Sequence, residues 1–348
     1  MKLDEIFTFE NLYSAYKNCR MSKQHKGEVI RFESNLAVNL NNLNKELTTK
    51  NYKLGNYKKF YIYEPKERLI EALPFKDRVV VRCFCDICLK PKIERKLIYD
   101  NCACRSGKGT TFAIDRLHKF LKKEYLKESN NEVYFLKCDI RKYFPSINHE
   151  ILIELLEEID FSNDEMWIIK KLIKDQPDNA SIGLPLGNQS SQWFALLYLN
   201  KIDHYIKEQL GIKCYVRYMD DMILVHRDKK YLSECKNKIK KLCNDLLDLE
   251  LNEKTQIGMV KNGIDFLGYR HILSSSGKII IKLRYSSKKR LKKHLKTVSK
   301  LYNKGIVDDE YVYQRKNSFY NHIKGTNEST KLKIDTFPFK KAKGQLKR

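Results

Sequence analysis

Three aspartates at the ends of short apolar segments are the residues in this sequence best suited to chemistry. Asp139 falls near the end of VYFLKCDI (133–140), while Asp220 and Asp221 lie inside KCYVRYMDDMILVHR (213–227). The first segment predicts a strand, and the second predicts a β-hairpin with the acids at its turn. If the strand ends are neighbours, three carboxylates repel one another at one sheet edge and require hard divalent cations. Two such ions, about 4 Å apart, can activate a hydroxyl and stabilise a leaving pyrophosphate.

The elements expected around these acids alternate between helices and strands. We expect residues 1–50 to be mainly helical, 51–63 to form a strand with charge on one face, and 264–283 to form a strand pair turning at SSSG. Helices are predicted over Asp77–Ile98, Thr111–Leu126, 149–159, 230–249 and the basic stretch 285–348, and IGLPLGNQSSQ (182–192) is a Gly/Pro loop leading into another helix. The pattern indicates an α+β fold.

Composition favours a nucleic-acid partner in a reducing compartment. The 348 residues carry a formal net charge of +25, spread along the chain, although a generally lysine-rich protein would look similar. No signal peptide and no apolar run long enough to cross a bilayer is apparent, so we expect a cytoplasmic protein without membrane contact. The ten cysteines lack the spacing of a zinc site and are interpreted as small buried residues.

Seven ordered segments give the sequence a family resemblance. YMDD (218–221) resembles the polymerase signature of reverse transcriptases. FLKCDIRKYFPSI (135–147), GLPLGNQSSQ (183–192) and LNEKTQI (251–257) resemble the first, second and fourth palm motifs, and DFLGYR (265–270) resembles the primer-grip hairpin. ERLIEALPFKDRVV (67–80) and NCACRSGKGT (101–110) resemble fingers motifs of the bacterial enzymes.

The resemblance implies an RNA-directed DNA polymerase with a right-hand architecture. Residues 1–50 would be an N-terminal helical extension, 51–130 the fingers, 131–272 the palm with part of the fingers, and 283–348 a basic helical thumb. Asp139 and Asp220 would ligate two Mg²⁺ ions, for which Mn²⁺ can substitute, with Asp221 alongside and the Ile140 carbonyl assisting. Lys254 matches a candidate general acid for pyrophosphate departure, although a solvated surface lysine is an equal alternative.

The resemblance also supplies candidates for binding the nucleotide and primer. Phe144 occupies the steric-gate position, where a ring would exclude a ribose 2′-hydroxyl and so favour dNTPs over RNA synthesis. SGKGTT (106–111) lacks the first glycine of a P-loop, so Arg105 and Lys108 are expected to touch template or nucleotide instead. The remaining candidates are Lys66, Arg68 and Arg78 for the triphosphate, Leu186, Gly187 and Gln192 for the nucleotide, and Phe266, Leu267 and Gly268 for the primer grip.

Details of the second palm motif point to a subtype. Leu186 before Gly187, with Gln192 ending the motif, resembles the enzymes of diversity-generating retroelements, which copy a template RNA inaccurately, chiefly at adenines. Defence-associated reverse transcriptases are near relatives, so an antiviral-defence enzyme that makes a specialised DNA product is the alternative function. A catalytically idle RNA-binding scaffold is the alternative from another class. The expected partners are an RNA template, a DNA or RNA primer and dNTPs, with a structured non-coding RNA and a small accessory protein as further candidates. No RNase H, maturase or endonuclease extension is apparent.

Overall fold

The computed structural model describes residues 1–63, 66–127, 132–175, 180–323 and 326. Its contacts divide the chain into two compact units. Unit 1 comprises residues 1–113, 137–223 and 233–256, and unit 2 comprises 114–136, 224–232 and 257–348. None of the described helices has both the length and the apolar character needed to cross a membrane.

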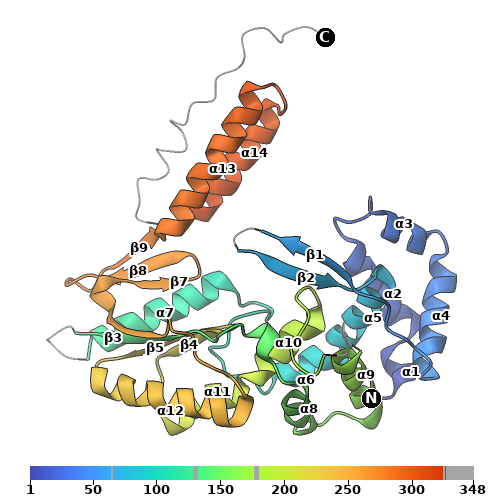
Figure 1. The fold of residues 1–348 in the computed structure, drawn as a ribbon, viewed down its shortest axis with the longest axis horizontal. Helices are drawn as coiled ribbons and strands as arrows, with labels where there is room; N and C mark the ends of the chain where they lie inside the picture. The colour runs from blue at the N-terminus through green and yellow to red at the C-terminus, as the bar shows by residue number, and fades with distance from the viewer. Residues whose placement is uncertain (64–65, 128–131, 176–179, 324–325, 327–348) are drawn as a thin grey trace. The chain divides into compact units, whose positions relative to one another are not determined.

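Unit 1 begins with four helices, as predicted for residues 1–50 (Figure 1). They are α1 (Leu3–Ile6), α2 (Phe9–Arg20), α3 (Gly27–Glu33) and α4 (Leu36–Thr48). Thr8 caps α2 by accepting a hydrogen bond from the Asn11 amide at 3.1 Å, which satisfies one of the free amides of the first turn. The apolar face of α2, with Leu12 and Tyr16, is buried and packs against α5 (Phe75–Phe84).

The strand expected over 51–63 is shorter than predicted. Strand β1 (Lys58–Ile62) pairs antiparallel with β2 (Arg68–Ala72), and all five residues of β1 are exposed. The expectation of charge on one face was wrong for β1, because Lys58 and Lys59 are consecutive and therefore point to opposite faces of the strand. Residues 51–57 instead form an irregular segment, in which Tyr52 is buried and donates to Asp77 at 2.5 Å.

The helix expected over Asp77–Ile98 is interrupted. It begins two residues earlier, after Pro74, and runs as α5, a π-helical turn at Cys85–Leu89, and α6 (Lys90–Glu94). The Lys90 amide bonds back to the Cys85 carbonyl, five residues earlier. Pro91 follows and has no amide hydrogen to continue the regular ladder, which gives the interruption a physical cause.

The central sheet has four strands in the order β4-β5-β3-β6. These are β3 (Tyr134–Cys138), β4 (Tyr215–Tyr218), β5 (Asp221–His226) and β6 (Gln256–Met259). Strands β4 and β5 form the hairpin predicted from the sequence, and β3 lies beside β5. The remaining helices of unit 1 are α8 (His149–Glu157), α9 (Asn163–Lys174), α10 (Gln189–Tyr198), α11 (Asn200–His204) with a π turn at Tyr205–Gln209, and most of α12 (Lys229–Leu247). The fold is of the predicted α+β class.

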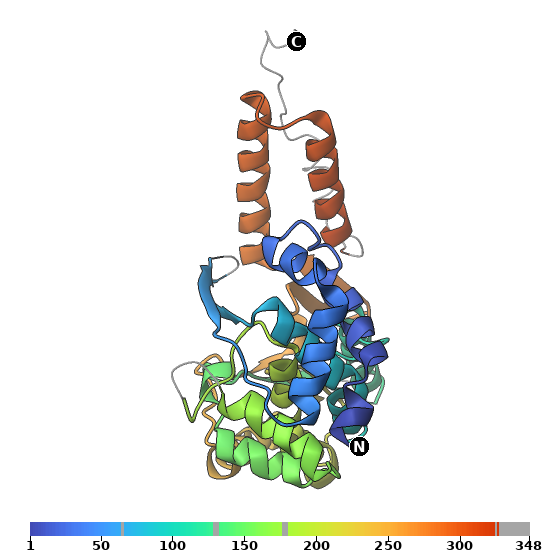
Figure 2. The same ribbon diagram turned by 90° about the vertical axis from the view of Figure 1, so that its right-hand side faces the viewer.

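Unit 2 contains a second sheet and the C-terminal helices. Strands β7 (Ile264–Phe266), β8 (Tyr269–Leu273) and β9 (Ile279–Leu283) form a three-stranded antiparallel sheet, one strand more than the expected pair. Helix α7 (Thr110–Tyr125) contributes most of its length to this unit. Helices α13 (Tyr285–Asn303) and α14 (Asp309–Ile323) run antiparallel (Figure 2), and Leu283, Leu291, Leu295 and Ile323 form a buried cluster with them. The predicted tail helix is confirmed to this point, and 327–348 lie outside the described residues.

Most cysteines are buried apolar residues, as predicted. Eight of the ten are buried, Cys19 is half-buried and Cys104 is exposed. Cys138 on β3 lies within interaction range of Cys235 and Cys243 on α12, and burial raises the pKa of the Cys138 thiol. The Cys138 thiol is thus buried near two buried thiols of α12.

Candidate active site

The sheet order brings the three predicted aspartates together at one edge. Asp139 directly follows β3, and Met219 and Asp220 form the turn between β4 and β5, where Asp221 is the first residue of β5. Met219 adopts a φ of +55°, in the left-handed region that makes this tight turn. The three carboxylates interact electrostatically with one another. The juxtaposition expected from two separate segments is therefore present.

Burial and mutual repulsion act on this cluster in the same direction. Burial raises the pKa of Asp220, and the neighbouring Asp139 carboxylate adds to the effect. Burial likewise raises the pKa of Asp221 to about 6, against the opposing charge of Lys137. The Lys137 ammonium lies 2.8 Å from one Asp221 oxygen and 3.0 Å from the other. Lys137 is thus the local counter-charge of the cluster.

The donor chemistry of this cluster fits Mg²⁺. In the described part of the chain no three His, Cys, Asp or Glu side chains form a ready metal site. Mg²⁺ is ordinarily held by one or two carboxylates together with substrate phosphates, so a preassembled cage is not required. The repulsion among these carboxylates, which adds to the raised pKa values of Asp220 and Asp221, would be relieved by such cations. Asp139, Asp220 and Asp221 are therefore the residues that would hold them.

Asp139 is fixed by the segment that carries Lys254. The Asp139 carbonyl accepts from the Asn252 amide at 2.7 Å, and its own amide donates to the Thr255 hydroxyl at 3.4 Å. Ile140 is buried and forms a bridge with Leu251. Lys254 is exposed in the turn that follows. The fourth motif is thus attached to the first through backbone bonds, and the proton-donor role of Lys254 stays a prediction.

The second motif forms a loop between Phe144 and β2. The Leu184 amide donates to the Phe144 carbonyl at 2.9 Å, and the Leu186 carbonyl accepts from the Glu71 amide at 3.0 Å. Phe144 is half-buried, with its ring edge-on to Tyr143 at 5.8 Å between centroids. Gln192, in the first turns of α10, accepts a hydrogen bond from the exposed Cys104 thiol at 3.3 Å. Motifs from three parts of the chain therefore surround one loop.

The structure separates the three phosphate-binding candidates. Arg68 lies close enough to Asp220 to oppose the rise in its pKa. Lys66 is exposed two residues before it, next to the undescribed residues 64–65. Arg78 is instead paired with Glu28 of α3, within the N-terminal helices. Arg68 is thus the candidate that the fold brings to the acids.

The loop containing Arg105 and Lys108 is held by its own cations. Arg105 pairs with Glu94 at 3.1 Å, and it donates to the Ile98 and Asn101 carbonyls at 2.8 and 3.1 Å. Lys108 donates to the Tyr99 carbonyl, with its ammonium 4.2 Å from the centre of the Tyr99 ring. Both groups stabilise the loop in this structure, and their contact with nucleic acid stays a prediction.

Gly187 provides a test of how tightly the second motif is packed. Its φ is +131°, and an added Cβ would lie 3.3 Å from the Glu71 carbonyl oxygen and from the Ile70 side chain. Gly187→Ala is therefore expected to lower the free energy of unfolding by about 1–3 kcal/mol, measured by denaturant titration. Gly211→Ala is the control, because φ there is +60° and nothing lies within 4 Å of the added atom. Equal losses for both variants would contradict close packing of this loop.

The primer-grip candidates lie in unit 2, at the β7–β8 turn. Phe266 is buried, while Leu267 and Gly268 occupy the turn with φ values of +47° and +89°. Two successive positive φ values are typical of a tight hairpin turn. The Gly268 carbonyl accepts from the Arg284 amide at 3.2 Å and the Ser287 hydroxyl at 3.3 Å, which connects the turn to the start of α13.

A buried histidine pair supports the same turn. His271 is fully buried, its Nδ1 lies 3.0 Å from His118 Nε2, and its Nε2 lies 3.4 Å from the Phe266 carbonyl. Burial lowers the pKa of His271 to about 4, and the neighbouring His118 contributes. Burial also lowers the pKa of His118. Both rings are therefore neutral in the folded state at neutral pH.

This pair predicts an acid-sensitive unit 2. Because the folded pKa of His271 lies below the unfolded value, its contribution to stability is complete above pH 6.5 and decreases toward pH 4. Between about pH 7 and about pH 5, the wild type should lose about 2 kcal/mol more than His271→Phe. Calorimetric unfolding of both proteins at the two pH values measures this difference. Identical pH dependence would show that His271 is protonated as easily when folded as when unfolded.

Sequence reasoning missed three charged residues of this site: Lys137, Asp203 and Arg217. Arg217 and Asp203 are both fully buried and form an ion pair at 2.6 Å. Breaking such a pair by removing one partner typically costs about 3–5 kcal/mol, whereas apolar replacement of both is often neutral. A signal was present, because Lys137 and Arg217 each interrupt an otherwise apolar strand, two and three residues before a predicted metal ligand.

Two antiparallel strands with a third beside them place three acids at one sheet edge. This arrangement is typical of the class of polymerases with a palm-type catalytic site. Residues 64–271 match the family described as reverse transcriptase (RNA-dependent DNA polymerase), and the chain belongs to that family. This match contains all seven segments singled out in the sequence.

Individual relatives are distant and longer than this chain. A putative COX1/OXI3 intron 2 protein of Saccharomyces cerevisiae is 21% identical over 213 residues, which is 54% of this chain and 23% of that protein. Among solved structures, the telomerase of Candida albicans in complex with a fragment of telomeric RNA matches with a TM-score of 0.50 at 14% identity, covering 73% of this chain and 51% of that one. Apo telomerase from Candida tropicalis gives 0.50 at 15%, covering 71% and 53%. These structures support the fold alone.

Proposed function

We propose that this protein is an RNA-directed DNA polymerase. The observation that carries the proposal is the meeting of Asp139, Asp220 and Asp221 at one sheet edge, within the stretch that matches the reverse transcriptase family. Family membership indicates the reaction class, and the three interacting carboxylates supply the ligand set that its chemistry requires. A scaffold without catalysis would gain nothing from three carboxylates that repel one another.

Each group at the site has a defined task in this reaction. Two bound Mg²⁺ ions would lower the pKa of the primer 3′-hydroxyl and neutralise the leaving pyrophosphate. Asp139, Asp220 and Asp221 would hold the ions, and Lys137 limits the repulsion among the acids in their absence. Arg68 provides a fork suited to triphosphate oxygens. Phe144 closes the space beside the sugar, which favours dNTPs.

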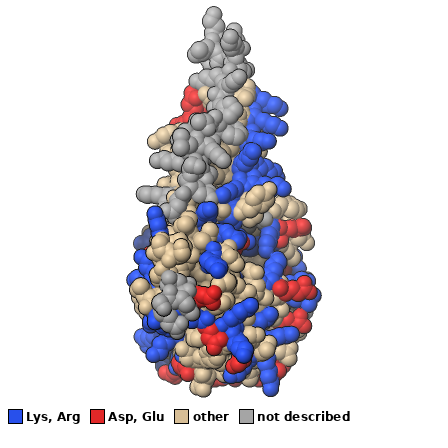
Figure 3. Space-filling model, turned by 90° about the vertical axis from the view of Figure 1, so that its left-hand side faces the viewer, with Lys and Arg blue, Asp and Glu red and all other residues tan. Residues whose placement is uncertain are grey.

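The charge of α13 supports a nucleic-acid duplex as the bound substrate. Five exposed lysines, at positions 289, 292, 293, 296 and 300, share one face of the helix, because 289, 292 and 296 and likewise 289, 293, 296 and 300 are three or four residues apart. Lys and Arg gather along this helix in the space-filling view (Figure 3). Lysines on one helix face can follow the phosphates of a template–primer duplex, with affinity that falls as salt rises.

Inaccurate copying in the manner of diversity-generating retroelements is part of the proposal. Leu186 offers an aliphatic side chain beside the nucleotide-binding loop, and its carbonyl is already occupied by the Glu71 amide. A nucleotide with one fewer polar contact is held less firmly and tolerates mispairing. Sequencing the cDNA tests this: an excess of errors at template adenines supports it, and uniformly low error contradicts it. Leu186→Gln should then reduce the error frequency.

One assay tests the main proposal. Purified protein is given an RNA template, an annealed DNA primer, dNTPs and Mg²⁺, and primer extension is followed over time. We expect extension that stops on chelation of the metal and that is weaker on rNTPs. Absence of extension, with simple and structured RNA templates alike, would contradict the polymerase proposal and leave an RNA-binding scaffold.

A further inference from the structure

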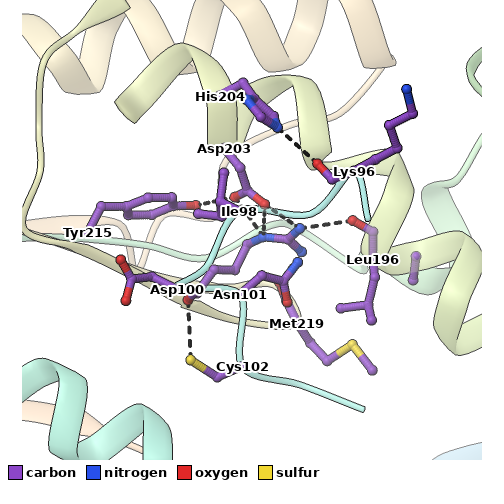
Figure 4. A network of polar contacts seen from close by, with 12 residues as sticks. Lys96, Ile98, Asp100, Asn101, Cys102, Leu196, Asp203, His204, Tyr215 and Met219 are labelled. Atoms are coloured by element: carbon purple, nitrogen blue, oxygen red, sulfur yellow. Dashed lines mark hydrogen bonds and ion pairs between the residues drawn. The ribbon is translucent and has the colours of Figure 1, made fainter. Parts of the chain in front are cut away.

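The residue preceding the YMDD turn is a fully buried arginine in a dense polar network. Arg217 Nε lies 2.7 and 2.9 Å from the two Asp203 oxygens, and Nη2 lies 2.6 Å from the second of them. The Tyr215 hydroxyl donates to Asp203 at 2.6 Å from the same strand. Figure 4 shows Tyr215 and Asp203 pointing toward one another from β4 and α11. Both charges are therefore compensated without water.

The rest of the guanidinium bonds to backbone carbonyls. Nη1 donates to the Met219 carbonyl at 2.9 Å, and Nη2 donates to the Leu196 carbonyl of α10 at 2.9 Å. Met219 is the residue in the left-handed region immediately before Asp220. Helix α10 carries Gln192. One side chain thus joins the catalytic turn to the helix of the second motif.

The backbone of Arg217 is fixed as firmly as its side chain. Its amide donates to the Asp100 carbonyl at 3.0 Å, and its carbonyl accepts from the Cys102 amide at 2.9 Å. These bonds hold β4 against the 100–102 segment, so the guanidinium starts from a defined position. The turn is consequently attached at its base rather than left to the hairpin alone.

We propose that Arg217 is a positioning residue. Asp203 and Tyr215 orient its guanidinium, which fixes the Met219 carbonyl. This bond sets the position of the Asp220 carboxylate relative to α10. The inference rests on the proposed polymerase function for its kinetic consequence. A buried ion pair is a weak source of stability, and apolar residues of similar volume can replace it. The planar fork of arginine bonds one carboxylate and two carbonyls at once, which the single nitrogen of lysine cannot do.

Two kinds of variant separate positioning from folding. The triple variant Arg217→Met/Asp203→Leu/Tyr215→Phe removes the buried ion pair and the tyrosine hydroxyl together, and Arg217→Lys retains the charge but not the fork. Arg20→Lys is the control for the latter, because Arg20 pairs with Glu33 at 2.7 Å in the N-terminal helices. Folding is checked by thermal unfolding before kinetics are measured.

The expected result is a selective loss of turnover. In either variant kcat should fall about 10²-fold, the loss typical of a misplacement near 1 Å, with the KM for template–primer unchanged. The Mn²⁺ affinity of the protein without nucleic acid should fall at least about tenfold, since the ligands are no longer fixed. Arg20→Lys should change neither. If the triple variant does not fold, Arg217→Lys and its Mn²⁺ affinity decide the question.

The strain at Met219 gives an independent readout. Glycine adopts positive φ readily, so a turn with glycine at position 219 should depend less on Arg217. The factor by which Arg217→Lys lowers kcat should therefore be smaller in the Met219→Gly background. A folded variant with wild-type kcat and wild-type Mn²⁺ affinity would overturn the proposal. So would an equal factor of loss in kcat with Met219 present and with Met219→Gly. If the wild type extends no primer, the polymerase proposal fails, while Mn²⁺ affinity still decides the role of Arg217.

Discussion

Replacing Asp220 with asparagine is expected to abolish primer extension while leaving the protein at least as stable as the wild type. Loss of a metal ligand removes several kcal/mol of transition-state stabilisation, so kcat should fall at least about 10³-fold. Stability should not fall, because burial already raises the pKa of Asp220 and a neutral amide avoids that unfavourable charge. Single-turnover extension and thermal unfolding measure the two effects.

Asp245→Asn is the matched control for this prediction. Asp245 is exposed on α12 and contacts the neighbouring Asn244 side chain at 3.4 Å, so its replacement should leave extension unchanged. Extension by Asp220→Asn within about tenfold of the wild type would contradict its assignment as a metal ligand. A marked loss of stability would instead show that the carboxylate serves the fold.

Replacing Phe144 with valine is expected to admit ribonucleotides. The ring is half-buried beside Tyr143, and its backbone carbonyl is fixed by the Leu184 amide, so the smaller side chain opens space without moving the chain. Discrimination between a dNTP and the matching rNTP, expressed as the ratio of kcat/KM values, should fall about 10²-fold. Steady-state incorporation of single nucleotides measures the ratio.

The outcome for Phe144 needs a control for general loosening of the fold. Phe161 is also half-buried, in a loop where the Lys92 ammonium lies 5.0 Å from its ring, and it belongs to none of the matched motifs. Phe161→Val should lower stability without changing the dNTP preference. If Phe144→Val keeps the wild-type ratio, the ring is a packing residue and selectivity has another source.

The parts of the fold with strong local patterns could be predicted from sequence. The alternating and apolar runs around Asp139, Asp220 and Asp221 gave the strands and the hairpin turn, because strand formers flank each acid. The N-terminal helices and the basic helix α13 follow from helical periodicity in the same way. The meeting of Asp139 with the hairpin needed one further assumption, strand adjacency, which the β4-β5-β3 order confirms.

The residues that sequence analysis missed owe their roles to contacts between segments that are distant in the chain. Asp203 appears as an ordinary helix residue, and only the fold places it against Arg217 in a buried pair. Lys137 appears as a solvated lysine until β5 brings Asp221 beside it. Arg78 was a candidate phosphate ligand because nothing near it in the sequence indicates its ion-pair partner. That partner, Glu28, lies 50 residues earlier in the chain. The local pattern thus identified the three acids, whereas their charged neighbours could be identified only from the folded structure.

The number of metal ions held by the three aspartates tests the central claim most directly. Electron paramagnetic resonance counts Mn²⁺ bound to the protein in the presence of template–primer and an unreactive dNTP analogue. The account predicts two ions per wild-type chain and fewer in Asp139→Asn and Asp220→Asn, with Asp245→Asn unchanged. Equal binding by the wild type and both site variants would contradict the assignment of these carboxylates as the metal site.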